Sequence, residues 1–309
     1  MPAHIDDTYA EAFRSIHAEV LVTARDRQWL EHAVNAATGH ASSTIMCDCE
    51  AGLAGWVDPT AGPGSQSTPD GRPGAILQFH VPRFRKDREP ALERALLARI
   101  SQNILTCPTT ACFNRIDSES YFKLGRKVAL FGDGHQFRDV RFDRKVWVIP
   151  IMMGEFVLDR RFGFRDGIMG GNLWFLADSA DSALLAAERA LTGVRQTPGV
   201  IAPFPGGVAS SGSKAGSRYS FLFASTNHPF CPTLRERLGN DSQVPEGVQS
   251  ISEIIINGRD LETVRQATRA AISASVDTPG LLRISAGNYG GRLGKNFIHL
   301  RGGETASER

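Results

Sequence analysis

A glutamate opens an apolar segment late in the chain, EIIINGRD. Alternation along a strand would place Glu253, Ile255 and Asn257 on one face. Burial in apolar surroundings raises the pKa of a carboxyl group, which can then act as a general acid near neutral pH. Glu50, in MCDCEAG, is a comparable candidate. The alternative for both residues is a solvated glutamate at the end of a strand.

A glycine- and serine-rich segment over 203–232 is a candidate binding loop. It reads PFPGGVASSGSKAGSRYSFLFASTNHPFCP. Glycine amides allow close approach of a ligand and can donate N–H groups to an oxyanion or a carboxylate. Interleaved apolar residues such as Tyr219 and Phe223 predict that part of the segment is buried, and the alternative is an ordered loop that binds nothing. The candidate binding residues here are Gly206, Gly207, Ser210, Ser211, Ser213 and Lys214.

A second glycine cluster, ISAGNYGGRLGKNFIHL, covers 284–300. Its glycines follow one expected strand and precede another, which suits a bulged hairpin as well as the rim of a pocket. Asn288 and Gly290 are the candidate binding residues in this cluster. Because it ends one copy of an internal repeat, as Gly206 and Gly207 end the other copy, we expect the two loops to lie near each other.

The five cysteines permit two further interpretations. Cys47 and Cys49 with Cys107 and Cys112 could supply four thiolates to zinc, but their spacing does not form CxxC pairs. A cysteine nucleophile needs a neighbouring histidine, and only Cys231 follows one closely, three residues after a histidine. Cysteines on a buried strand face are the alternative, and no metal site is expected.

A repeated strand–helix–strand unit positions the candidate residues. Segments beginning at Asn172 and Glu253 align without a gap at an offset of 253 − 172 = 81 residues. Each begins with an apolar strand, places a helix N-cap candidate seven residues later (Ser179 and Asp260), and reaches Thr-Pro-Gly at the same phase. The apolar residues of each helix recur on one face, as expected for a helix that covers a sheet.

The N-terminal half repeats this pattern less clearly. Asp26 is the expected cap of a helix that ends at Gly39, and a strand through Ile45 and Met46 is expected to follow. Another strand begins at Ala75, and its helix begins near Pro90. The runs KVALFG, KVWVIP and EFVLD predict a small hairpin subdomain within 113–165, and the Gly/Pro-rich stretch 53–73 predicts a loop.

Two strand–helix–strand units in succession form the ferredoxin-like βαββαβ pattern. We therefore predict an α+β fold of two tandem ferredoxin-like lobes with loop and hairpin insertions, 1–150 and 151–309, joined within 145–165. The C-terminal lobe is expected to carry much of the active site. The alternative is a doubly wound parallel sheet, but no GxGxxG or GxxxxGK[ST] motif follows a strand.

Composition excludes several classes of protein. The chain has 309 residues, 35 Lys plus Arg and 33 Asp plus Glu, and a net charge of +2, which gives no support to a nucleic-acid binder. No apolar run approaches the roughly 18 residues of a membrane span. Asp6, Asp7 and Glu11 occupy the region where a signal peptide would carry basic and then apolar residues. We therefore expect a cytoplasmic protein.

Seven strings, taken in order along nearly the whole chain, closely resemble one family, formylmethanofuran:tetrahydromethanopterin formyltransferase. Cys49, Cys112 and the near-neutral charge differ from archaeal members and suggest the bacterial branch, in which the enzyme is a subunit of a formyltransferase/hydrolase complex of methylotrophs. The strings are IMCDCEAG, TPDGRPG, FGDGHQ, APFPGGVASSGSKAGS, ASTNHPFCPT, EIIINGRD and ISAGNYGGRLGKNFIHL.

The resemblance implies formyl transfer between the primary amine of a methanofuran-type carrier and N5 of tetrahydromethanopterin, both substrates, with no bound cofactor or metal. It also implies ferredoxin-like lobes, a homodimer or homotetramer, and hydrolase partner subunits. Glu253 matches the family's proton-shuttling glutamate. Loops 206–217 and 287–291, with Ser225, Thr226 and Asn227, would form the cleft, and Lys214 could counter a carboxylate or the oxyanion.

Direct attack of an amine on a formamide passes through a tetrahedral oxyanion, and the leaving amine must be protonated. No nucleophilic side chain is needed. Two other functional classes remain: a non-catalytic scaffold subunit that kept the fold, and a cysteine-dependent amidohydrolase.

Overall fold

The computed structural model describes residues 2–59 and 67–301. They form two compact units: unit 1 consists of Met1–Phe13 and Ile168–Arg309, and unit 2 of Arg14–Gly167. The predicted ranges divided the chain once, after residue 150. The compact units differ from these ranges because β1 (His4–Ile5) and the beginning of β2 (Tyr9–Thr23) pair with the two last strands of the chain.

Unit 2 contains an antiparallel sheet with the strand order β3-β4-β2-β5. Two helices follow β2 and β4 in sequence, so this part of the chain runs β-α-β-β-α-β. β5 pairs in parallel with β9, and β9, β8 and β7 continue as an antiparallel hairpin layer. Its elements are β2, α1 (Arg27–Thr38), β3 (Glu50–Val57), β4 (Gly74–Pro82), α2 (Arg88–Arg99), β5 (Ala111–Asn114), β6 (Tyr121–Phe122), α3 (Leu124–Ala129), β7 (Phe137–Arg141), β8 (Arg144–Ile151), β9 (Gly154–Asp159) and β10 (Phe162–Gly163).

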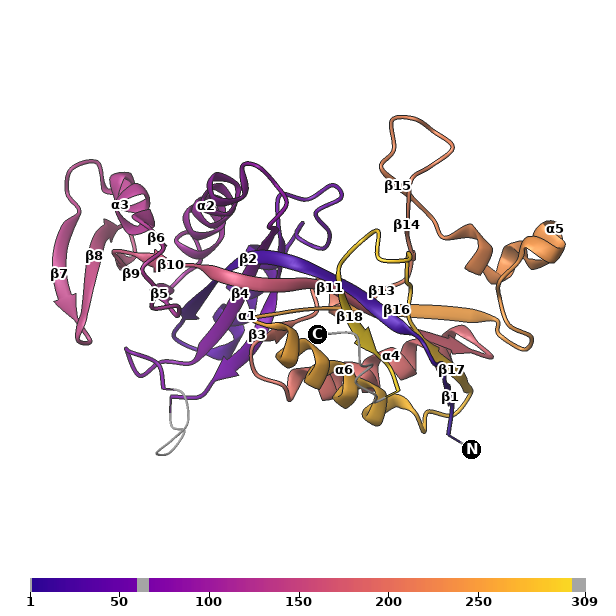
Figure 1. The fold of residues 1–309 in the computed structure, drawn as a ribbon. Helices are drawn as coiled ribbons and strands as arrows, with labels where there is room; N and C mark the ends of the chain where they lie inside the picture. The colour runs from indigo at the N-terminus through magenta and orange to yellow at the C-terminus, as the bar shows by residue number, and fades with distance from the viewer. Residues whose placement is uncertain (1, 60–66, 302–309) are drawn as a thin grey trace. The chain divides into compact units, whose positions relative to one another are not determined.

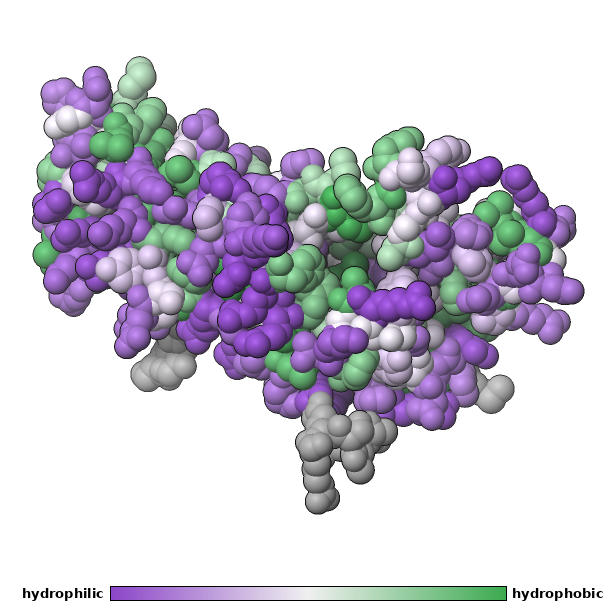
Figure 2. Space-filling model, turned by 45° about the horizontal axis from the view of Figure 1, so that its top comes forward, coloured by the Kyte–Doolittle hydropathy of each residue, from purple (hydrophilic) through white to green (hydrophobic). Residues whose placement is uncertain are grey.

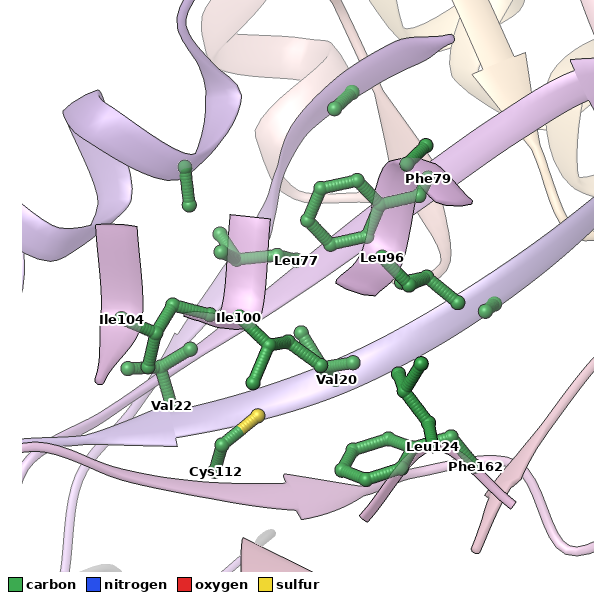
Figure 3. Packing of buried hydrophobic residues seen from close by; sticks show 14 of the residues in the cluster. Val20, Val22, Leu77, Phe79, Leu96, Ile100, Ile104, Cys112, Leu124 and Phe162 are labelled. Atoms are coloured by element: carbon green, nitrogen blue, oxygen red, sulfur yellow. The ribbon is translucent and has the colours of Figure 1, made fainter. Parts of the chain in front are cut away.

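The core of unit 2 lies between this sheet and its two long helices. Figure 3 shows Val20 of β2 and Leu77 and Phe79 of β4 beside Leu96 of α2 and Ile100, just after it. Cys112 points into the same cluster. Burial of these side chains stabilises the unit by removing apolar surface from water, and it places the Cys112 thiol in the core.

Unit 1 repeats the arrangement with the order β17-β11-β16, and two short strands, β12 and β13, pair with the far edge of β16. Both long helices, α4 and α6, contact β16 and each other (Figure 1), and the buried residues of both include alanines. Its elements are β1, β11 (Arg165–Ala177, which begins in unit 2), α4 (Ala180–Arg195), β12 (Val200–Ile201), β13 (Val208–Ala209), β14 (Lys214–Ala215), β15 (Ala224–Ser225), α5 (Arg235–Leu238), β16 (Ser250–Gly258), α6 (Leu261–Ser275), β17 (Leu281–Ser285) and β18 (Asn296–His299).

The predicted helix caps are confirmed. Asp26, Ser179 and Asp260 are the N-caps of α1, α4 and α6, and each side chain accepts a hydrogen bond from a backbone N–H of the first turn. These bonds satisfy donors that a helix cannot pair internally. The internal repeat at an offset of 81 residues therefore corresponds to two structurally matching strand–helix pairs.

Three local predictions were wrong. Ile45 and Met46 form a turn instead of a strand, and their side chains are 46% and 80% exposed. All of KVALFG is helical, in α3 and the 3₁₀ turn after it, because Val128 and Ala129 lie with the preceding Leu124 on one buried helical face. The predicted loop 53–73 begins later, since β3 continues to Val57, and its residues 60–66 lie outside the described part of the chain.

The Gly/Ser-rich segment forms an arm. β14 and β15 pair as an antiparallel ribbon, which Figure 1 shows standing out from the sheet of unit 1. Part of the segment is buried as predicted, at Gly207 and Ala209. The aromatic residues near the tip of the arm are not in that part: Tyr219, Phe221 and Phe223 are 56%, 75% and 84% exposed. An arm this narrow has no second layer under which to bury them.

Candidate active site

Glu253 lies in the middle of the unit 1 sheet. On β16 it is directly opposite Trp174 of β11 on one side and Ala209 of β13 on the other. The residue is 8% exposed. Asn172 Nδ2 and Trp174 Nε1 both donate hydrogen bonds to its Oε1, each at 2.9 Å. In the described part of the chain no hydrogen bond reaches Oε2, so this oxygen can hold or deliver a proton.

The surroundings of Glu253 favour the protonated form. Burial raises the pKa of its carboxyl above the ordinary value, and the hydrogen bonds from Asn172 and Trp174 offset part of this rise. The hydrogen bonds stabilise the carboxylate but do not neutralise it. A carboxyl group with a raised pKa and one open oxygen is suited to general acid–base chemistry.

Asn172 presents a second unpaired polar atom at this place. Its Oδ1 is buried and has no hydrogen-bond partner among residues 2–59 and 67–301. A buried acceptor without a partner costs about 1–3 kcal/mol, and a bound N–H group would satisfy it. Gly287 packs against the same residues: a Cβ there would lie 2.7 Å from the Trp174 ring and 2.9 Å from Asn172 Nδ2. Glycine at 287 therefore lets the loop approach the two donors to Glu253.

Glu11 determines the shape of the second glycine loop. Its carboxylate accepts backbone hydrogen bonds from Tyr289, Gly291, Leu293 and Gly294. Burial opposes ionisation of this carboxyl, but the four backbone hydrogen bonds outweigh it and lower the pKa. These four amides are therefore occupied by the protein's own anion.

Tyr289 connects the two glycine loops. Its hydroxyl donates a hydrogen bond of 2.8 Å to the backbone oxygen of Ser213, which confirms the expectation that the loops lie near each other. Burial, together with the negative charges of Glu253 and Glu11, raises the pKa of Tyr289 to about 12. The tyrosine therefore stays a neutral hydrogen-bond donor, and its ring lies within electrostatic reach of Glu253.

The remaining predicted residues of unit 1 lie around these loops. Gly206 and Gly207 adopt φ values of 64° and 91°, a turn that leads into β13 beside Glu253. Asn288 Nδ2 donates to Thr8 Oγ1, and Gly290 is exposed with a φ of 65°. The side chains of Ser210, Ser211 and Ser213 are exposed.

Four predicted residues lie on the arm or just after it. Lys214 pairs with Ser225 across the ribbon, and Ser225 Oγ donates to the backbone oxygen of Gly216. Thr226 and the backbone oxygen of Asn227 contact the Cys231 thiol. No hydrogen bond or ion pair in the described residues joins Lys214, Ser225, Thr226 or Asn227 to Glu253.

Glu50 belongs to unit 2, where it opens β3 opposite His80. It is buried, and it accepts a hydrogen bond from the backbone N–H of Thr44 at 3.1 Å. The structure therefore assigns Glu50 a structural partner, and Glu50 and Glu253 fall in separate units.

The cysteines do not form a reactive or metal-binding group. Burial raises the pKa of the Cys49 and Cys112 thiols, which makes both poor nucleophiles. Asp48, between Cys47 and Cys49, is held by the Arg99 guanidinium. Among the residues that the structure describes, no three His, Cys, Asp or Glu side chains gather as metal ligands, and no helix there is long and apolar enough to cross a membrane.

Sequence reasoning did not name Glu11, Asn172 or Trp174 as site residues, and it included Tyr289 only within the predicted cleft loop 287–291. Asn172 and Trp174 had a usable signal, because the repeat aligns Asn172 with Glu253 and adjacent strands of such a unit can face each other. Glu11 had none, since its loop partners lie about 280 residues away in sequence.

Comparison with known proteins identifies the family. The family model described as "Formylmethanofuran-tetrahydromethanopterin formyltransferase" matches residues 2–151, and the model described as "FTR, proximal lobe" matches residues 154–302. The chain belongs to the formylmethanofuran–tetrahydromethanopterin formyltransferase family. Curated members that it resembles include those of Methanocaldococcus jannaschii, 44% identical, and Methanosarcina acetivorans, 46% identical. Each alignment covers 96% of this chain, and 97% and 96% of these relatives respectively.

Two solved structures of this formyltransferase family have the same fold. The formyltransferase from Methanosarcina barkeri superimposes with a TM-score of 0.89 and 42% identity, covering 96% of this chain and 97% of that one. A chain of the formyltransferase/hydrolase complex from Methylorubrum extorquens, solved with methylofuran, gives a TM-score of 0.87 and 38% identity, covering 96% and 95%. The mixed α/β architecture is therefore that of the family's known structures.

Proposed function

We propose that this chain transfers a formyl group between the primary amine of a methanofuran-type carrier and N5 of tetrahydromethanopterin, and that Glu253 is the proton shuttle. Family membership supports the reaction. The observation that carries the assignment of the residue is the buried Glu253 carboxyl, which has a raised pKa and one unpaired oxygen. In this reaction both carriers are substrates, and no resident cofactor takes part.

The proposed reaction balances without a co-reactant. The incoming amine attacks the formamide carbon, a C–N bond forms, and the carbonyl becomes a tetrahedral oxyanion. The protonated Glu253 donates its proton to the leaving nitrogen, the old C–N bond breaks, and the carboxylate recovers a proton from the nitrogen that attacked. Protonation is required because an amide anion is too poor a leaving group. Net proton uptake is zero, so the same residue serves both directions.

Asn172 is proposed to orient the amine. Its unpaired Oδ1 is an acceptor, and an amine that approaches Glu253 carries N–H groups to donate. The bond would place the nitrogen close to the carboxyl that exchanges its proton, which is a positioning effect. Ser210, Ser211 and Ser213, exposed next to β13, are proposed to bind polar groups of the carriers, and Lys214 a carboxylate.

The direct test uses the purified chain with both carriers and detects the N5-formylated pterin by mass spectrometry. We expect formyl transfer that persists after alkylation of Cys231 and Cys47. Loss of activity on alkylation would support a cysteine-dependent amidohydrolase. A folded chain that forms no product with either carrier as donor would support the non-catalytic scaffold.

We propose that the chain forms a homodimer or homotetramer through the arm. Phe221 and Phe223 are 75% and 84% exposed, and exposed aromatic clusters of this kind mark interaction sites. The double variant Phe221→Ser/Phe223→Ser is expected to lower the mass measured by light scattering to that of one chain. An unchanged mass would exclude the arm as the contact.

Hydrolase subunits are proposed as further partners, because a structural relative was solved in a formyltransferase/hydrolase complex. Affinity purification of the tagged chain from its native cells, followed by mass spectrometry, tests this. Recovery of the chain without hydrolase subunits would contradict it.

Each unit is proposed to be a ferredoxin-like lobe. The order β3-β4-β2-β5 in unit 2 and the order β17-β11-β16 with β12 and β13 at the edge in unit 1 support this assignment. In both, the first and third strands of the β-α-β-β-α-β run are neighbours. A crystal structure with different strand neighbours would overturn it.

A further inference from the structure

A hollow in unit 2 is surrounded by positive charge. It has a volume of about 240 Å³ and lies among α3, β7, β8 and the turn after β9. Five of its six lining side chains are cationic and none is a carboxylate. They are Lys123, Arg126, Arg138, Trp147, Arg160 and Arg161.

Three neighbouring cations outside the hollow are paired with carboxylates. Arg141 binds Asp139 and Glu155, Arg144 binds Asp159, and Lys127 binds Glu93. By contrast, none of the five cations that line the hollow takes part in an ion pair with any described residue. Their positive charge is therefore not neutralised by a carboxylate of the described chain.

Two of the lining guanidinium groups are held by aromatic rings. Arg138 lies over the Trp147 ring at 5.2 Å and Arg161 over the Tyr121 ring at 4.3 Å. Stacking on a ring occupies the face of a guanidinium and leaves its N–H edge available. These arginines are therefore oriented without being neutralised, which reduces the entropy that a ligand would have to remove.

Five like charges around one hollow repel one another, and this repulsion is relieved when an anion enters. We propose that the hollow binds an oxyanion, either a phosphate or a carboxylate group of a small polyanionic molecule. Guanidinium edges recognise both groups through paired hydrogen bonds. A larger hollow of about 540 Å³ also has Arg160 and Arg161 in its lining, but Asp143 and Asp159 line it too, so the anion is assigned to the smaller hollow.

The surface of this part of unit 2 is mixed. Figure 2 shows hydrophilic residues beside hydrophobic ones where α3, β7 and β8 lie, and the exposed Phe131 and Val140 are among the hydrophobic residues. The site rests on residues of unit 2 alone and does not depend on the role of Glu253 in unit 1. Failure of one proposal therefore leaves the other intact.

The test is isothermal titration of the full chain with two probes, inorganic pyrophosphate and citrate, at low salt. Tighter binding of pyrophosphate would identify phosphate as the group recognised, and tighter binding of citrate a carboxylate. The variant Arg126→Gln/Arg160→Gln is expected to raise the Kd of the better probe about tenfold, because two charge-assisted contacts are lost. The Glu253→Gln variant is expected to bind the probe as the wild type does.

The matched control is Arg195→Gln/Arg269→Gln, which removes the same charge from exposed positions of α4 and α6. This control is expected to leave the Kd within about twofold of the wild type, because neither arginine lines the hollow and neither can make a charge-assisted contact with the probe. Failure of both probes to bind the wild type would overturn the proposal. An equal loss of binding in the control would also overturn it, since net charge rather than the hollow would then be responsible.

Discussion

Glu253 and Glu11 are two buried carboxyl groups of unit 1, and their pKa values move in opposite directions. Both side chains are nearly closed to solvent, since Glu253 is 8% exposed and Glu11 is 1% exposed. Glu253 lies deeper in the protein, so burial raises its pKa more strongly. The sets of donors differ as well. Glu253 has two neutral side-chain donors on one oxygen, whereas Glu11 has four backbone N–H groups shared between its two oxygens.

The difference separates two roles. A carboxylate whose four acceptor positions are filled is stable as an anion and has no place for a proton, so Glu11 holds a loop. A carboxyl group with one satisfied oxygen keeps the other for proton exchange, so Glu253 can perform chemistry. Pairs of acids with diverging pKa values are a known basis for assigning such roles.

Replacing Glu253 should have the largest effect. Glu253→Gln keeps the shape and an oxygen that can accept from Asn172 and Trp174, but it cannot exchange a proton. We expect kcat to fall by about 10²–10⁴-fold, with KM for both carriers nearly unchanged, in steady-state assays. Turnover at the wild-type rate in this variant would remove Glu253 from the mechanism.

Replacing Glu11 should act through the loop. Glu11→Gln lacks the charge, and its amide N–H groups would face backbone N–H groups that need an acceptor. We expect a loss of about 2 kcal/mol in the free energy of unfolding, measured by urea denaturation, and a higher KM with a smaller change in kcat. Faster hydrogen exchange at the amides of Tyr289 and Gly291 would show that the loop has loosened. A variant as stable as the wild type would mean that the four bonds contribute little.

Trp174→Phe tests the environment of Glu253 more finely. The ring contact with Phe230, with centroids 4.8 Å apart, is retained, while the Nε1–H donor to the carboxylate is lost. The pKa of Glu253 should therefore rise further, and the limb of the pH–rate profile on which activity falls with rising pH should move up by about one pH unit. Movement of this limb toward lower pH would contradict the assigned donor role.

The smallest expected effect is on the way the free energy of unfolding depends on pH. The pKa of Glu11 is lowered from 4.5, so its stabilisation is present above pH 4.5 and is lost as the pH falls through the folded-state value. The pKa of Glu253 is raised, so the folded state binds more protons and its contribution falls as the pH rises above 4.5. Denaturation should be measured from pH 3 to 7. The free energy of unfolding should fall less in Glu11→Gln than in the wild type as the pH is lowered, and less in Glu253→Gln than in the wild type as the pH is raised. Each difference should be under about 1 kcal/mol. Equal slopes of the free energy of unfolding against pH in the two variants would contradict the opposite pKa shifts of Glu11 and Glu253.

Periodicity and capping chemistry predicted much of the local structure, because they depend on residues close in sequence. Asp26, Ser179 and Asp260 were found from the residue type at the start of an apolar helical pattern. Ile45 and Met46 were misassigned because an apolar pair in a turn has no period that distinguishes it from a short strand. The aromatic residues of the arm did not show which part of the segment is buried, because hydrophobicity does not reveal whether a second layer is present to cover a side chain.

Glu253 was predicted as a candidate site residue from its apolar strand and from the family resemblance. The repeat predicted that the two glycine loops lie near each other, and the Tyr289–Ser213 hydrogen bond confirms this. The donors on it were not predicted, because strand pairing decides which side chain of β11 faces it. The roles of Tyr289 and Glu11 could not be predicted, since they depend on contacts between residues about 280 positions apart in sequence.

Glu11 is synthesised before unit 2, and the amides that it binds are synthesised after unit 2. Unit 2 lies between them in sequence and can fold while the rest is still being made. The 289–294 loop, by contrast, must wait until about 280 further residues have followed Glu11. The chain thus completes the Tyr289–Ser213 contact late in its synthesis, so a truncated product would carry a finished unit 2 but no assembled site.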